Sequence, residues 1–197
     1  MFPLGSVLFP SMVLPLHIFE PRYRAMVRDV LAGRGSFGVV LIAQGHEVGG
    51  RDIRTDVGTL AQVIRAEELP DGRWALVAVG VGRLRVHAWL PDDPYPRARV
   101  ELWPDEPMAD DLEEVQRDNE ARLRRVLALA SEAGEPAAPA TVELAADPVL
   151  AGYQMAALAP VSTVEQHRLL SAPGPTERAV ALRATLSELE LFLRTRL

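Results

Sequence analysis

The chain has 197 residues, which is enough for one domain or for one domain with a second lobe, and it contains neither cysteine nor lysine. These absences exclude disulfides, thiol nucleophiles, cysteine-based zinc sites, P-loop or Schiff-base lysines and Ser-Lys dyads, and they fit a reducing cytoplasm. Residues 1–100 carry 12 Arg against 10 Asp and Glu, whereas residues 101–197 carry 9 Arg against 17, so the acidic second half makes nucleic acid a poor candidate partner.

Short apolar runs separated by turn signals predict strands through the first hundred residues. Between two of these runs, Asp71-Gly72 is a hairpin signal. Several short strands at close spacing predict a small antiparallel β-barrel. The runs are residues 7–9, 12–16, 37–42, 58–67, 74–81, 83–89 and 97–103.

One helix interrupts the predicted strands. Pro21 suits a first helical position, and apolar residues from Tyr23 to Leu31 recur at helical spacing. Gly33 then ends the helix as a C′ glycine would. Packed over the mouth of the barrel, the apolar stripe of this helix would close the core.

The second half of the chain predicts helices. Leucine, valine and alanine between residues 112 and 130 recur at helical spacing, and a Pro/Ala linker follows at residues 132–141. Asp147-Pro148 begins a helix through Leu158, and Ser162 has capping-box spacing to Glu165. A last helix begins at residue 175. The sequence therefore predicts an α+β chain with a barrel lobe over residues 1–104 and a helical lobe over residues 105–197.

A fifteen-residue segment carries a family resemblance. Residues 9–23 read FPSMVLPLHIFEPRY, which resembles the signature of the Lon protease N-terminal domain with Ser11 in place of the usual glycine. Weaker agreements follow along nearly the whole chain. They lie at residues 58–59, 69–72, 80–83, 166–170 and 177–178.

The resemblance implies a PUA-like antiparallel barrel with one inserted helix, followed by a C-terminal helical bundle. In Lon this domain helps to recognise unfolded or tagged proteins before an ATP-driven motor translocates them. Without lysine, neither a Walker A motif nor a Ser-Lys peptidase can be carried over to this sequence. We therefore expect a stand-alone recognition module that is not an enzyme and needs no cofactor.

Residues 18–23 allow two interpretations. Arg22 and Tyr23 could contact a bound peptide, or Glu20 and Arg22 could fix a strand-to-helix corner with Phe19 and Tyr23 in the core. The structural interpretation is favoured. Arg83 likewise could reach a ligand carboxylate or hold a corner of the barrel. The candidate peptide-binding residues are Pro15, His17, Phe19, Glu20, Arg22, Tyr23 and Arg83.

Other motifs carry little chemistry. Residues 33–38 match G-x-G-x-x-G, but they follow a helix and open a strand, the reverse of a dinucleotide site. The four histidines have no metal-ligand spacing, and His46, Glu47, Asp52 and Asp56 are better interpreted as a solvated hairpin tip than as a cation site. We expect no metal.

Three functions stay open at this stage. The favoured function is binding of unfolded or tagged protein segments, or of a partner protein. Such binding would use either an apolar groove between the lobes or strand addition at a sheet edge. RNA binding by a PUA-like barrel and a small-molecule sensor or adaptor are the alternatives. No apolar run approaches the roughly 18 residues of a membrane helix, and residues 1–16 lack the features of a signal peptide. A soluble cytoplasmic protein without a membrane partner is expected.

Overall fold

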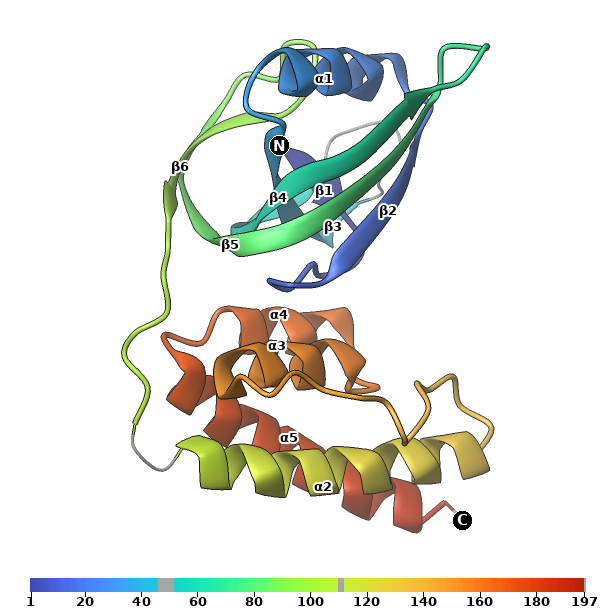
Figure 1. The fold of residues 1–197 in the computed structure, drawn as a ribbon, viewed down its shortest axis with the longest axis vertical. Helices are drawn as coiled ribbons and strands as arrows, with labels where there is room; N and C mark the ends of the chain where they lie inside the picture. Colours follow the sequence, from blue (N-terminus) through green and yellow to red (C-terminus); the bar gives the residue numbers. More distant parts are fainter. Residues whose placement is uncertain (46–51, 110–111, 197) are drawn as a thin grey trace. The chain divides into compact units, whose positions relative to one another are not determined.

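The computed structural model describes residues 1–45, 52–109 and 112–196. The chain divides into two compact units, Met1–Pro104 and Asp105–Leu197. The first unit contains the strands and one helix, and the second contains the remaining helices (Figure 1). The protein is therefore α+β, with a mixed sheet followed by helices.

The strands of the first unit form a six-stranded sheet with the path β1-β3-β4-β5-β2. β2 and β6 pair with different halves of β5. We expected an antiparallel sheet, and this is wrong in one respect, because β1 runs parallel to β3. The bounds are Phe2–Leu4 (β1), Val13–Ile18 (β2), Ser36–Gln44 (β3), Ile53–Glu68 (β4), Trp74–Leu90 (β5) and Arg97–Leu102 (β6).

The apolar run at residues 7–9 is not a strand, although we expected one. This segment crosses the sheet. Its backbone carbonyl groups accept hydrogen bonds from a side chain and within a turn, and they do not pair with a neighbouring strand. Buried Thr59 donates its hydroxyl to the Leu8 carbonyl oxygen at 2.5 Å. A Cβ atom on Gly80 would lie 2.4 Å from the Phe9 carbonyl oxygen. The crossing therefore requires a residue without a side chain at position 80.

Helix α1 (Pro21–Ala32) lies over one end of the curved sheet (Figure 1). Pro21 occupies its first turn as expected, and α1 buries Tyr23, Met26 and Val27 against the core of the first unit. A C′ glycine usually has a positive φ. Gly33 instead has φ −100°, and the positive φ falls two residues later, at Gly35.

The second unit contains α2 (Leu112–Glu132), α3 (Pro148–Leu158), α4 (Thr163–Leu170) and α5 (Pro175–Arg194). The expected caps are present, since Asp147 accepts from the Leu150 N–H and Ser162 accepts from the Glu165 N–H. α2 packs along α5, and each buries leucines at helical spacing. None of the helices in the described ranges is long and apolar enough to cross a membrane.

Candidate functional site

Strand β2 presents two different faces. Leu14, Leu16 and Ile18 turn toward the core of the first unit, whereas the alternate residues Val13, Pro15 and His17 are exposed. This alternation follows from the pleat of a strand, in which successive side chains point to opposite faces. The residues that the sequence singled out, Pro15 and His17, are therefore on the outward face.

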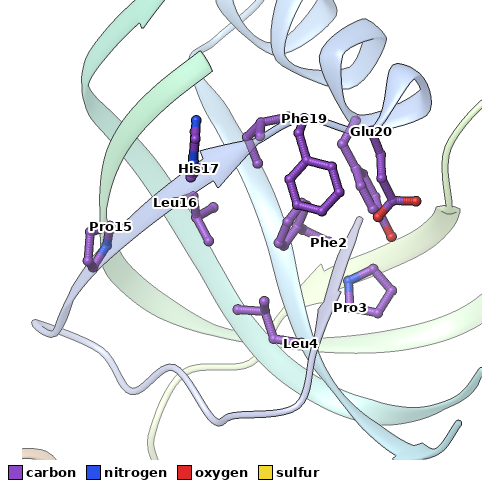
Figure 2. Close-up of a pocket in the computed structure, with 10 residues that line it drawn as sticks. Phe2, Pro3, Leu4, Pro15, Leu16, His17, Phe19 and Glu20 are labelled. Carbon is purple, nitrogen blue, oxygen red and sulfur yellow. The ribbon is translucent and has the colours of Figure 1, made fainter. Parts of the chain in front are cut away.

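β1 and β2 are the two ends of the sheet path, and a pocket lies where they approach each other. β1 pairs with β3, and β2 pairs with β5; within the described residues neither has a second strand partner. Figure 2 shows the residues that line this pocket. Its volume is 210 Å³. Its lining comprises Phe2, Pro3 and Leu4 of β1, the segment from Pro15 to Phe19, and Glu20 and Tyr23.

The corner between β2 and α1 is fixed by its own side chains. The Arg22 guanidinium donates from Nε to the Glu20 carboxylate at 3.1 Å and lies 4.5 Å from the centroid of the Tyr23 ring. The Arg24 N–H bonds to the Glu20 carbonyl oxygen at 2.9 Å. Both charges at the rim of the pocket are therefore paired with each other.

Tyr23 forms part of the pocket wall. Its side chain is 5% exposed, and its ring centroid lies 4.5 Å from that of Phe2. Burial raises the pKa of Tyr23 to about 12, because a phenolate is poorly solvated there. The ring is therefore neutral at physiological pH and contributes an apolar surface.

Phe19 departs from the structural interpretation of the corner. We expected it in the core with Tyr23, but its side chain is 54% exposed. It follows Ile18, which occupies the inward position, so the alternation turns Phe19 outward. A half-exposed phenylalanine at the edge of an apolar pocket is available to a bound molecule.

A second hollow lies on the outward face of the sheet. Its volume is 430 Å³, and it is lined from β2, β5 and β4. In the sheet register, Pro15 lies beside Val77, and Val77 beside Arg65; His17, Ala75 and Glu67 form the next row. Arg65 and Glu67 pair with each other at 3.3 Å. The two hollows therefore share Pro15, Leu16 and His17.

Arg83 is not gathered with the other six candidates. It is 3% exposed, its guanidinium lies 4.1 Å from the Trp103 ring centroid, and its Nη2 donates to the Pro104 carbonyl oxygen at 3.4 Å. Arg85 lies on the same ring at 4.0 Å. The structure thus brings Pro15, His17, Phe19, Glu20 and Tyr23 to one pocket, and Arg22 contacts two of them, Glu20 and Tyr23.

The sequence missed the β1 side of the pocket. Phe2, Pro3 and Leu4 showed no strand pattern, and the only signal for them was that they are apolar. No group of three or more histidine or carboxylate side chains within residues 1–45, 52–109 and 112–196 could hold a metal ion. Of the hairpin tip considered above, His46 and Glu47 lie outside the described residues.

In the described residues, a mixed sheet with α1 is followed by α2 to α5, which is the arrangement of a known class of α+β domain. The chain matches the crystal structure of a Lon N-terminal domain protein from Xanthomonas campestris with a TM-score of 0.66 and 26% sequence identity. That match covers 93% of this chain and 95% of the other.

The sequence model of the ATP-dependent protease La (LON) substrate-binding domain matches residues 1–188, and the chain belongs to this family. It is 32% identical over 111 residues to a Lon protease of Anaeromyxobacter dehalogenans, covering 55% of this chain and 13% of the relative. A Lon protease 2 of Herpetosiphon aurantiacus is 29% identical over 189 residues, covering 94% of this chain and 23% of the relative. The chain thus spans less than a quarter of the length of these two proteases.

Proposed function

We propose that this chain recognises protein segments that are unfolded or tagged, and that it does so at the pocket between β1 and β2 without catalysing a reaction. The observation that carries this proposal is an apolar pocket of 210 Å³ at an open sheet edge, with the half-exposed Phe19 in its lining. Membership of the substrate-binding domain family supports the same assignment.

The proposed roles follow from the surroundings of each side chain. Phe19 supplies exposed apolar surface, Pro15 lines the pocket from β2, and Tyr23 forms its wall. Glu20 and Arg22 hold the corner through their ion pair. Burying a phenylalanine side chain against a ligand contributes about 1.5–3 kcal/mol, so Phe19 is the residue on which binding depends most.

The proposal also covers the architecture of the two units, the role of Arg83 and the location of the protein. We infer that the curved sheet is a PUA-like barrel and that the helices of the second unit form a bundle. We assign Arg83 to a corner of this barrel, because it is buried on Trp103. A cytoplasmic location fits the absence of cysteine.

The test is binding of a fluorescently labelled, permanently unfolded polypeptide, such as reduced and alkylated α-lactalbumin, measured by fluorescence anisotropy. Phe19→Ala is expected to raise the Kd about ten- to a hundredfold. Phe192→Ala is the matched control, because Phe192 is 52% exposed and lies in the second unit. Its Kd is expected to stay within about twofold of that of the original chain.

Two results would overturn the proposal. One is equal binding by the Phe19→Ala and Phe192→Ala variants, and the other is no binding of any unfolded polypeptide by the original chain. Incubation with casein tests the non-catalytic part, and no fragments are expected on a denaturing gel. Fragments that a purified sample keeps producing, and that a variant of the chain does not, would contradict it.

A further inference from the structure

The backbone of β2 has a free side, and its orientation can be worked out from one hydrogen bond. The Gly80 N–H donates to the Met12 carbonyl oxygen at 3.0 Å. Backbone groups alternate along a strand, so Leu14, Leu16 and Ile18 also direct theirs toward β5. Val13, Pro15 and His17 therefore direct their backbone groups away from β5, to the side on which no described strand pairs with β2.

Pro15 limits what this free side can bond. A proline has no N–H, so the donors on the free side of β2 are those of Val13 and His17, while all three carbonyl groups remain acceptors. Proline on an edge strand is a common device against uncontrolled strand pairing. The free side is thus open near His17 and restricted at Pro15.

The two hollows lie on the two sides of this edge. The 210 Å³ pocket, shown in Figure 2, lies at the gap toward β1. The 430 Å³ hollow lies on the outward face, and Pro15, Leu16 and His17 are common to both. A strand added beside β2 would lie about 4.8 Å away and would turn alternate side chains to opposite faces. One set would enter the pocket and the other would lie along the outward face.

The charges around both hollows are already paired. Glu20 is held by Arg22 at 3.1 Å, and Glu67 by Arg65 at 3.3 Å. Neither hollow therefore offers an unbalanced charge to a ligand from these four side chains. The complementary occupant is an uncharged segment with apolar side chains.

We propose that the protein segment bound at this site is an extended, uncharged, apolar strand that pairs with the free edge of β2 through the backbone of His17. This inference rests on the proposed function and specifies the conformation and chemistry of the segment. A helical segment would leave the His17 N–H and carbonyl group unbonded, whereas an extended one satisfies both.

The test uses a set of labelled octapeptides built from leucine, valine and serine, each carrying a single backbone N-methyl group at a different position. In a paired strand only alternate N–H groups face β2. N-methylation at those positions is expected to weaken binding at least tenfold, and at the intervening positions by less than about threefold. The loss of affinity is therefore expected to repeat every two residues.

Substitutions in β2 test the same bonds from the other side. Pro15→Ala restores a donor and is expected to tighten octapeptide binding about two- to tenfold. His17→Pro removes a donor and is expected to weaken binding by a similar factor, whereas His17→Ala keeps the backbone donor and is its matched control. Thermal unfolding of each variant checks that the fold is retained.

The outcomes separate this inference from the function on which it rests. If N-methylation at every position left octapeptide affinity unchanged while Phe19→Ala still lost binding, strand pairing would be overturned. The recognition of protein segments would then still stand. Absence of octapeptide and polypeptide binding by the original chain would overturn both. A two-residue period together with tighter binding by Pro15→Ala supports the inference.

Discussion

Each of the two units is stabilised internally, and the kind of internal contact differs between them. In the first unit, backbones approach each other closely, as where Phe9 crosses β5 at Gly80 and Thr59 bonds to Leu8. In the second unit, ion pairs with one buried partner join α5 to α2 and to the segment that precedes α2. Arg178 is 1% exposed and donates to Asp105 at 2.7 Å and to the Tyr153 hydroxyl at 3.1 Å.

This difference predicts different sensitivities to mutation. A close backbone contact tolerates no added atom, whereas a buried ion pair tolerates no missing partner. Glu190 extends the pattern in the second unit, because its carboxylate binds arginines from both α2 and α5. We therefore expect the first unit to be sensitive to added atoms at Gly80 and the second to loss of charge at Arg178.

The largest effect is expected for Arg178→Met. The change removes the buried Arg178 cation from the carboxylate of Asp105 and the hydroxyl of Tyr153, which still bond to each other at 2.8 Å. It should lower the free energy of unfolding by about 3–5 kcal/mol. Arg183→Met is the matched control, because the ion pair of Arg183 with Asp118 is exposed and 3.9 Å long. Urea unfolding followed by circular dichroism measures both. Equal losses in the two variants would contradict the importance of the buried pair.

Gly80→Ala tests the close contact in the first unit. The new Cβ atom would lie 2.4 Å from the Phe9 carbonyl oxygen, and we expect a loss of about 2–3 kcal/mol. Gly82→Ala is the control two residues away on the same strand, where nothing lies within 4 Å of the added atom. A change of less than about 1 kcal/mol is expected there. Equal losses in the free energy of unfolding for Gly80→Ala and Gly82→Ala would contradict the importance of the close backbone contact in the first unit.

Tyr23 gives the first unit a pH dependence at the alkaline end. Its pKa is raised to about 12 in the folded chain, mainly by burial, and is about 10 when unfolded. The stability that Tyr23 contributes through this pKa difference is fully present below pH 10. It is lost as the pH rises toward 12, where the free energy of unfolding falls by up to about 2 kcal/mol. Because the chain contains no lysine, lysine deprotonation does not obscure this range.

Tyr23→Phe should remove this alkaline loss, as measured by urea unfolding between pH 8 and pH 12. Tyr95→Phe is the comparison, since the hydroxyl of Tyr95 donates to the Asp29 carboxylate at 2.7 Å and is more accessible to solvent. An alkaline loss of unchanged size in Tyr23→Phe would mean that another group carries the dependence.

Sequence patterns predicted the second unit better than the first, and the reason is physical. The boundaries at Asp147 and Ser162 depend on a side chain bonding three residues ahead, which is a local interaction. β1 depends on parallel pairing of Phe2–Leu4 with residues 39–41 of β3, which no local pattern records. The run at residues 7–9 is apolar because it crosses the core, so its composition resembled that of a strand.

The sequence predicted the β2 and α1 side of the candidate site but not the β1 side. The signature segment contains Pro15, His17, Phe19, Glu20 and Tyr23, and all five line the pocket. Helical spacing suggested that Phe19 was buried with Tyr23, but Phe19 directly follows the inward-facing Ile18 at the end of β2, and it continues the two-residue alternation of that strand. Arg83 was selected for its position after Gly82, which carries no information about which way the guanidinium turns.

The smallest effect is expected at Ser11, and it has the opposite sign. Phe9 to Met12 form a turn closed by the Met12 N–H and the Phe9 carbonyl oxygen at 3.2 Å, with Pro10 second and Ser11 third at φ 66°. Proline followed by a positive φ defines a type II turn, whose third position favours glycine. Among the described residues Ser11 is the only one other than glycine with a positive φ.

Ser11→Gly should therefore stabilise the chain by about 1 kcal/mol, because glycine adopts this conformation without the steric cost that a Cβ atom carries. Ser11→Ala keeps the Cβ atom and is expected to give no gain, which separates the backbone effect from loss of the hydroxyl. Thermal unfolding resolves a difference of this size. The result bears on the first unit directly, since the same turn delivers the chain from the crossing over Gly80 into β2, and a gain confined to glycine would show that backbone geometry limits its stability.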